Sequence, residues 1–310
     1  MANVTIKQIR AFVSAAENGS FTRAAIASHM SQSAFTRIIH DLEYEVKIKL
    51  FDRASHGMEL SDAGVEFLGA ARTMLNHYSV TIERLKLYQL GNGRSLTVTM
   101  SDATAGVVLP LFGTTLKKAF PAITLSAVSG TSEKMLDMMS TGKSDIGFGA
   151  LPLQIHDVHK KLILKARVGL LISKRYVAFN GIATVADLMK INLVKYAGAV
   201  SLNAIIAEHI PQLDVECEAT ATAANFMTMM GILHSGIAGA LVSSLSASHP
   251  WARELDFFPL PTPIYRDIYL FSSANLPAAA RLQPYTEILE QAIRAAPWHP
   301  STIIVPQSTV

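Results

Sequence analysis

The stretch SFTRAAIASHMSQSAFTRIIHDLE, residues 20–43, decides how the first part of the chain folds. Ser20 and Ser31 each stand where a helix can begin, because a serine side chain accepts a backbone N–H that the first helical turn leaves free. The stretch therefore predicts two helices, over residues 21–28 and 31–45, joined by a tight turn.

A further helix is predicted before this stretch, over residues 5–16. Thr5 and Gln8 have the spacing of a capping box, in which each side chain accepts a backbone N–H of the other residue. Apolar residues then recur with the spacing of one buried helix face, at Ile6, Ile9, Phe12, Val13 and Ala16. Three short helices with a tight turn between the last two are typical of a helix-turn-helix.

Residues 50–61, LFDRASHGMELS, predict a hairpin wing with Gly57 between two short strands. A long helix then runs from Ser61 to about Leu90. Its apolar residues alternate steps of three and four, as in a coiled coil: Leu68, Ala71, Leu75, Tyr78, Ile82 and Leu85. The stripe favours dimerisation through this helix, and the alternative is packing against its own chain.

Short apolar strands alternate with helices over residues 95–296, which predicts an α/β fold with mostly parallel sheets. The length allows two lobes, and we expect the chain to cross between them near 165–168 and to return near 262–267. The last residues, 297–310, contain three prolines and no periodicity. They are predicted to form a flexible tail.

The helix over residues 31–45 has the pattern of a DNA-reading helix. Polar residues occupy its first half, where a recognition helix enters the major groove: Gln32, Ser33, Thr36 and Arg37. Glutamine can pair with adenine and arginine with guanine, although Arg37 equally suits a phosphate. The opposite face is predicted to be buried and consists of Ala34, Phe35, Ile39 and Leu42. The net charge of this part of the chain says little about DNA binding, since residues 1–60 hold seven basic and six acidic residues.

Residues 4–68 resemble the winged helix-turn-helix of LysR-type transcriptional regulators. The shared residues are Phe12, Ala16-Glu17, Gly19-Ser20-Phe21, Ala24-Ala25, Ser31-Gln32, Ala34, Arg37, Ile39, Leu42-Glu43, Leu50-Phe51, Arg53, Leu60 and Ala63-Gly64. The rest of the chain, to residue 296, resembles the same family more loosely. The shared residues there are Pro110, Phe120-Pro121, Gly142 and Asp145. Several residues depart from the family pattern, namely Ile26, Ser28, Ser33, Ile38, Lys47, Ala238 and Ser243. Among them, Ser33 replaces a usual proline and Lys47 a usual glycine. A left-handed backbone at Lys47 costs about 1 kcal/mol.

The resemblance implies an α/β protein overall, with a winged helix-turn-helix followed by a long linker helix and a two-lobed effector domain built like a periplasmic binding protein. The implied boundaries are 1–60 for the DNA-binding domain, 61–92 for the linker and dimerisation helix, 93–296 for the effector domain and 297–310 for the tail. Within the effector domain, lobe 1 covers about 93–165 and 268–296, and lobe 2 about 166–267.

The resemblance also implies roles for individual residues of the DNA-binding domain. Gln32, Ser33 and Thr36 resemble the groove readers of the family. Arg37 and Arg53 resemble its contacts to the DNA backbone or minor groove. Further contacts near phosphates are expected from Ser55 in the wing and from Thr22 and Arg23 on the supporting helix.

A ligand cleft is expected where strands of the two lobes end. The candidate residues follow predicted strands or begin predicted helices: Ser101, Thr104, Thr131, Ser132 and Phe148 in one lobe, and Tyr196, Gly198, Ser201, Asn225 and Phe226 in the other. Free N–H groups at helix starts favour an anion, so a small carboxylate is the expected effector. The alternative is that these serines and threonines only cap helices. Asp102 would oppose an anion, so it either faces outward or recruits a cation.

Other protein classes fit less well. The chain has no GxSxG, P-loop, HExxH or dinucleotide fingerprint, so an enzyme is not expected. Its ten histidines lack ligand spacing, and its one cysteine, Cys217, cannot form an internal disulfide. No metal or cofactor is therefore expected. A transport-type solute-binding protein would account for the α/β part but not for residues 1–90.

The predicted function is therefore transcriptional regulation controlled by a small effector. The expected partners are promoter DNA, the effector, a second or further copies of the chain as a homodimer or homotetramer, and RNA polymerase. No apolar run of membrane-spanning length and no signal-peptide core occur, so a cytoplasmic protein without a membrane partner is expected.

Overall fold

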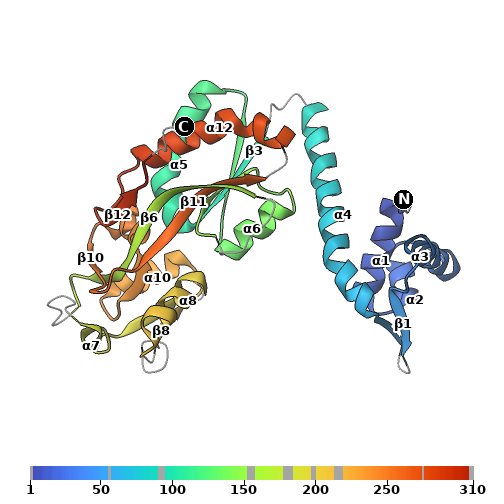
Figure 1. Ribbon diagram of the computed structural model, residues 1–310, viewed down its shortest axis with the longest axis horizontal. Helices are drawn as coiled ribbons and strands as arrows, with labels where there is room; N and C mark the ends of the chain where they lie inside the picture. The colour runs from blue at the N-terminus through green and yellow to red at the C-terminus, as the bar shows by residue number, and fades with distance from the viewer. Residues whose placement is uncertain are drawn as a thin grey trace. The chain divides into compact units, whose positions relative to one another are not determined.

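The computed structural model of the protein describes residues 3–54, 57–89, 95–151, 158–176, 184–196, 200–212, 219–273 and 276–306. The chain forms two compact units, Met1–Gln89 and Leu90–Val310 (Figure 1). The first is helical with a small hairpin, and the second mixes helices with a large sheet, which confirms the predicted α/β fold class. None of the helices in the described ranges is long and apolar enough to cross a membrane.

Three short helices begin the first unit, and all three predicted helix starts are confirmed. The helices are α1 (Ile6–Asn18), α2 (Phe21–Ala27) and α3 (Gln32–Val46). The capping box forms, since Thr5 Oγ1 accepts the Gln8 N–H at 3.3 Å and Gln8 Oε1 accepts the Thr5 N–H at 2.8 Å. Ser20 caps α2 by accepting the Arg23 N–H, and Ser31 caps α3 by accepting the Ala34 N–H.

Aromatic side chains join the three helices to the wing and to the long helix. The wing is an antiparallel hairpin of β1 (Phe51–Ala54) and β2 (Gly57–Leu60), and the long helix is α4 (Asp62–Gln89). The fully buried Phe12 ring lies 5.3 Å from Phe51 and 4.9 Å from Phe67, measured between centroids. These contacts place hairpin, α1 and α4 around one core.

The predicted dimerisation stripe on α4 divides into two halves. Ala71 is completely buried, and Leu68 and Leu75 pack against the same core, because α1 lies against this part of α4. The prediction that this half meets a partner helix is therefore wrong for Ala71. Further along the helix, Tyr78 and Leu85 are 40% and 56% exposed, so the second half of the stripe presents apolar side chains to solvent.

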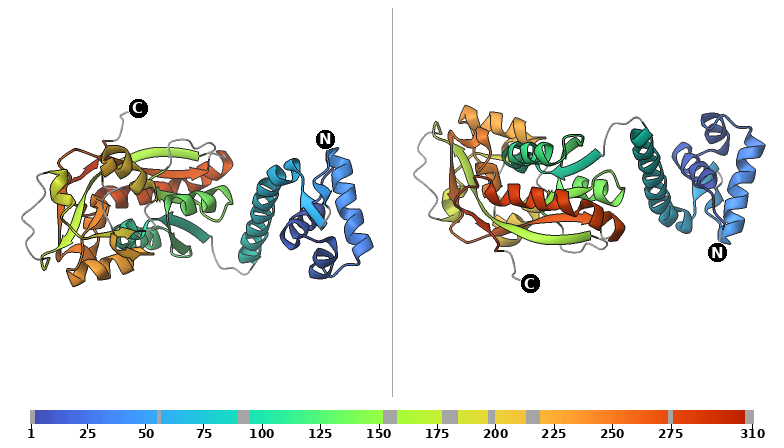
Figure 2. Two further views of the ribbon diagram at one scale, coloured as in Figure 1. Left: turned by 90° about the horizontal axis from the view of Figure 1, so that it is seen from below. Right: turned by 90° about the horizontal axis from the view of Figure 1, so that it is seen from above.

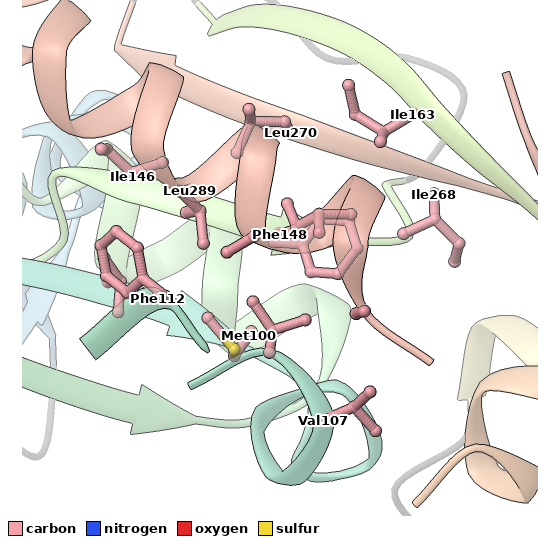
Figure 3. Packing of buried hydrophobic residues seen from close by; sticks show 14 of the residues in the cluster. Met100, Val107, Phe112, Ile146, Phe148, Ile163, Ile268, Leu270 and Leu289 are labelled. Atoms are coloured by element: carbon pink, nitrogen blue, oxygen red, sulfur yellow. The ribbon is translucent and has the colours of Figure 1, made fainter. Parts of the chain in front are cut away.

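The first lobe of the second unit is built on a mixed sheet in the order β6-β11-β5-β3-β4. The strands β3 (Ser95–Met100), β4 (Thr124–Ser129) and β5 (Ile146–Gly149) are parallel, whereas β11 (Tyr265–Ser273) runs antiparallel to β5 and β6. The helices of this lobe are α5 (Asp102–Ala119), α6 (Ser132–Ser140) and α12 (Leu276–Ala295), and α5 packs against α12 (Figure 2). The core between sheet and helices includes Met100, Phe112, Phe148 and Leu289 (Figure 3).

A single strand, β6 (Val158–Ser173), runs through both lobes beside β11 (Figure 1). Its residues 158–167 pair with β11, and its last residues pair with two strands of the second lobe, β9 (Ala240–Ser243) and β10 (Leu255–Pro259). The other elements of this lobe are α7 (Val185–Leu188), β7 (Leu193–Tyr196), α8 (Val200–His209), β8 (Ala219–Ala223), α10 (Phe226–Ser235), α11 (Ser244–Ala247) and the 3-10 helix η1 (Pro250–Ala252). The strands β7 and β8 form a parallel pair.

The prediction of a flexible tail is wrong for residues 297–306. Strand β12 (Thr302–Ile304) pairs antiparallel with residues 164–166 of β6. Trp298 donates from Nε1 to the Ile293 carbonyl at 2.7 Å, and its ring centroid lies 6.3 Å from that of Phe148. Prolines exclude a helix here but tolerate an edge strand, and β6 offers an open edge for such a strand.

Candidate nucleic-acid interface and ligand cleft

The exposed face of α3 carries the predicted DNA-reading residues. Ser31 begins the helix by accepting the Ala34 N–H at 3.3 Å. Buried Phe35 and Ile39 hold one side of the helix in the core. The residues that point to solvent are Gln32, Ser33, Thr36 and Arg37. All four lie in the first two turns, as a helix that enters the major groove requires.

One residue of the predicted buried face is misplaced. Ala34 is exposed, since the buried stripe follows Phe35, Ile39 and Leu42 at steps of four and three, and Ala34 lies one position off that line. Ala34 therefore belongs to the exposed surface beside Gln32.

The other predicted DNA contacts lie on the supporting helix and the wing. Thr22 and Arg23 are exposed on α2. Arg53 lies on β1, where its backbone pairs with Met58. Ser55 lies outside the described residues.

A buried carboxylate, Glu43, joins α3 to the wing, and the sequence patterns did not predict this role. Its oxygens accept the Lys49 ammonium at 2.7 Å and the backbone N–H groups of Leu50 and Phe51 at 2.8 and 3.2 Å. Burial acts to raise the pKa of Glu43, but these three donors outweigh it and hold the pKa below its ordinary value. The ionised side chain thus fixes where the hairpin leaves the reading helix.

The end of α3 has the left-handed backbone that a glycine usually adopts. Lys47 has φ 58° and ψ 27° at this position. The expected strain of about 1 kcal/mol at this lysine therefore applies.

The second unit contains a cleft where elements of its two lobes meet. The cleft is small, with a cavity volume of about 70 Å³, and it is partly open to solvent. Polar lining comes from Ser101, Asp102, Thr131, Ser132, Tyr196, Ser243, Ser246 and Arg266, and apolar lining includes Met135, Leu202, Phe226, Val242, Leu245 and Ile268.

Two helix N-termini point at this cleft. Ser101 caps α5 by accepting the Thr104 N–H at 3.4 Å, and Thr131 caps α6 by accepting the Lys134 N–H at 3.3 Å. Both caps line the cleft. The positive ends of these helices favour a negatively charged group.

Arg266 supplies a charge that was not among the predicted site residues. It lies at the start of β11, and its Nη2 donates to Ser132 Oγ at 3.4 Å. Burial lowers the pKa of Arg266 to about 10, although Glu133 and Tyr196 act in the opposite direction. The guanidinium is therefore charged at neutral pH. The available signal was an arginine at the start of an apolar strand, within the predicted return between the lobes.

Asp102 and Tyr196 complete the polar part of the cleft. Asp102 is one of the residues that line it. Burial, and then the charge of Asp102, raise the pKa of the Tyr196 phenol, whereas Arg266 lowers it. Both charges therefore act on the phenol.

The cleft brings together five of the predicted ligand residues: Ser101, Thr131, Ser132, Tyr196 and Phe226. Phe148 does not belong to it, because its ring is fully buried in the first-lobe core, and the next residues, Gly149 and Ala150, line the cleft instead (Figure 3).

Two predicted hydroxyl or amide ligands form hydrogen bonds at helix starts and do not line the cleft. Thr104 is completely buried and hydrogen-bonded to Ser101, with 3.0 Å between the two hydroxyl oxygens. Asn225 is exposed and accepts the Thr228 N–H at 2.9 Å. Gly198 lies outside the described residues, and of Ser201 only the backbone, in α8, is described.

Comparisons with known proteins identify both units. Residues 6–65 match the family described as "Bacterial regulatory helix-turn-helix protein, lysR family". Residues 90–294 match the "LysR substrate binding domain".

Curated relatives agree with this assignment. The regulator TfdT of Cupriavidus pinatubonensis is 34% identical over 144 residues, which are 46% of this chain and 63% of TfdT. ClcR of Pseudomonas putida is 32% identical over 143 residues, 46% of this chain and 49% of ClcR. The chain thus spans about half to two thirds of these relatives. YvbU of Bacillus subtilis, an uncharacterised regulator, is 26% identical over 86% of this chain and 91% of its own length.

Solved structures share the fold. CbnR, a LysR family transcriptional regulator crystallised in complex with its target DNA, superposes with a TM-score of 0.62 at 21% identity, covering 93% of this chain and 100% of CbnR. The two family matches together span most of the chain, from residue 6 to residue 294. The chain belongs to the LysR family of bacterial regulators.

Proposed function

We propose that this protein is a sequence-specific DNA-binding transcriptional regulator whose activity changes when a small organic acid binds in the cleft of its second unit. One observation carries the proposal: polar side chains cluster on the exposed first turns of α3, within a helix-turn-helix whose other face is fully buried. Membership of the LysR family supports the same function.

The reading roles follow from side-chain chemistry. Gln32 lies at the first position of α3, from which an amide can pair with the edge of adenine. Arg37, Arg53 and Arg23 are assigned to phosphates, where a cation adds affinity without sequence preference. Ser33 and Thr36 are permissive neighbours that accept several bases.

The effector role rests on the charge of the cleft. Arg266 and the N-terminus of α6 provide the positive groups that a carboxylate requires. A ligand shifts a regulator between states only through its different affinity for those states. We therefore infer that the effector changes how the two lobes close around the cleft, and through that the DNA complex.

Self-association is assigned to the exposed second half of α4. Tyr78, Ile82 and Leu85 continue the apolar stripe beyond the intramolecular core, and a partner helix would remove them from water. A homodimer through this surface, or a homotetramer, would present at least two reading helices to one DNA duplex. RNA polymerase remains a proposed partner at the bound promoter.

The test is a footprint of the full chain on DNA that flanks its own gene. Gln32→Ala should relax sequence preference, with a cost of about 1–3 kcal/mol at one base position. Arg53→Ala should weaken binding to every sequence and flatten the dependence on salt. Gln283→Ala, an exposed change on α12, is the control and should leave binding unchanged.

The outcomes separate this proposal from its main rival. No protected site on the neighbouring promoter would favour a solute-binding protein without a regulatory role. Identical effects of Gln32→Ala and Arg53→Ala on specific and nonspecific DNA would refute the division between reading and positioning residues.

A further inference from the structure

The charges that line the cleft are not those of a site for a simple anion. Arg266 contributes one positive charge and Asp102 one negative charge, and both residues line the same cavity. Glu133, beside Arg266, adds a second carboxylate to this region. Burial lowers the pKa of His249 near Asp102, although Asp102 acts against this, so the imidazole is mostly neutral at neutral pH. The fixed charges therefore sum to no net positive charge.

The two opposite charges come from different elements, and among the described residues no ion pair joins them. Asp102 is the first residue of α5, whereas Arg266 lies on β11 and donates to Ser132 at the start of α6. Both charges act on the pKa of the Tyr196 phenol, which lies on β7 of the other lobe: Asp102 raises this pKa and Arg266 lowers it. Among the described residues, none donates a hydrogen bond to the Asp102 carboxylate or forms an ion pair with it.

A ligand whose only charged group was a carboxylate would provide a partner for Arg266 but not for Asp102. It would contact Arg266 and the N-terminus of α6, but on filling the cleft it would also strip water from Asp102 and offer no donor in return. A carboxylate that loses water without gaining a partner is costly. A ligand with an additional cationic group would pair with Asp102 and remove this cost.

We infer that the effector is a zwitterion of the amino-acid type, whose carboxylate pairs with Arg266 at the start of α6 and whose ammonium group pairs with Asp102 at the start of α5. Tyr196 lines the same cleft, and a phenol hydroxyl can donate to a carboxylate or accept from an ammonium group. Apolar lining from Met135, Leu202, Phe226 and Ile268 accommodates a hydrocarbon side chain. This inference rests on the proposal that the cleft is the effector site.

The experiment compares matched pairs of ligands that differ by one amino group. The pairs are pentanoate and norvaline, phenylpropanoate and phenylalanine, and butyrate and γ-aminobutyrate, each titrated calorimetrically into the full-length protein. We expect an amino member of these pairs to bind at least about tenfold more tightly than its plain carboxylate, which is the effect of one partly buried ion pair. The position of the preferred amino group then reports the spacing between Asp102 and Arg266.

Two variants and one control assign the preference to named residues. Asp102→Asn should bring the affinity ratio of amino member to carboxylate close to one, while carboxylate binding persists. Arg266→Gln should weaken both members of a pair by at least about tenfold. Asp137→Asn, an exposed change on the same helix α6 at a residue outside the cleft lining, should leave the preference for the amino member in place. Thermal unfolding of each variant shows whether it is folded.

Several results would overturn the inference. They are equal binding of both members of every pair by the wild type, an unchanged ratio in Asp102→Asn, and no binding by any amino member. The wild-type comparison needs no variant, so it decides even if Asp102→Asn does not fold. Binding of plain carboxylates alone would leave the proposed regulator intact, whereas absence of a DNA footprint would remove the regulator without bearing on the ligand ratio.

Discussion

Replacement of Glu43 by glutamine should loosen the wing of the DNA-binding unit. Glu43 is 8% exposed and accepts three hydrogen bonds, from Lys49, Leu50 and Phe51. Glutamine has nearly the same shape but keeps only one acceptor oxygen. Its NH₂ group would face either a backbone N–H or the Lys49 ammonium, both of which are donors.

The expected loss is about 2 kcal/mol in the free energy of unfolding of this unit. The backbone N–H groups of Leu50 and Phe51 share one oxygen of Glu43, so glutamine keeps both bonds but makes them neutral. A hydrogen bond to a charged acceptor contributes about 1.5–3 kcal/mol and a neutral one about 0.5–1.5 kcal/mol, so each of the two bonds loses about 1 kcal/mol. The Lys49 side chain is 68% exposed, so water replaces its contact at little cost.

Hydrogen exchange of the full-length chain measures this loss directly in peptides from α3 and the hairpin. The control is Asp41→Asn, which removes a carboxylate from an exposed position of the same helix and should change exchange little. Equal protection of wild type and Glu43→Gln in the hairpin would refute the reasoning.

The difference in free energy of unfolding between wild type and Glu43→Gln should also depend on pH. The folded pKa of Glu43 is lowered, so its contribution is complete above the ordinary value of 4.5 and disappears as the pH falls through the folded pKa. Wild type and Glu43→Gln should therefore converge only in acid. A gap that stays constant through that range would show that the negative charge of Glu43 contributes nothing.

Three further changes test other parts of the structure by chemical denaturation. Lys47→Gly should stabilise the first unit by about 0.5–1 kcal/mol, because glycine removes the left-handed strain, while Lys47→Ala should not. Trp298→Ala should cost about 2–3 kcal/mol in the second unit, because the C-terminal segment loses its anchor, whereas the exposed Trp251→Ala should cost far less. Ala71→Leu should cost about 1–3 kcal/mol through overpacking against α1, and Leu85→Ala should weaken self-association without a folding cost.

The candidate site on α3 was predictable because its determinants are local. A helix exposes residues according to their spacing, so the buried positions Phe35 and Ile39 also place Gln32 and Thr36 on the opposite, exposed side. Ala34 was the exception, since a small apolar residue at the edge of the stripe fits either side. Ser20 and Ser31 were reliable helix starts because a cap depends only on neighbours along the chain.

The cleft was predictable only in part because its residues meet through tertiary contacts. Ser101 and Thr131 follow strands, which is a local signal, but whether a side chain on a buried strand points to the core or to the cleft depends on the sheet. Phe148 points to the core for this reason, and Arg266 reaches the cleft from a strand more than a hundred residues away from Ser132.

The sequence by itself determined the helix-turn-helix, the order of the elements and the family, because helix caps, periodicity and turn residues act over a few positions. Only the tertiary structure decided which surfaces face one another. It showed that α1 buries Ala71 of the long helix, that β12 pairs with an open edge of β6, and that Asp102 and Arg266 line one cleft. The physical reason is that burial and opposing charge belong to pairs of distant segments, and no periodicity along one segment records its partner.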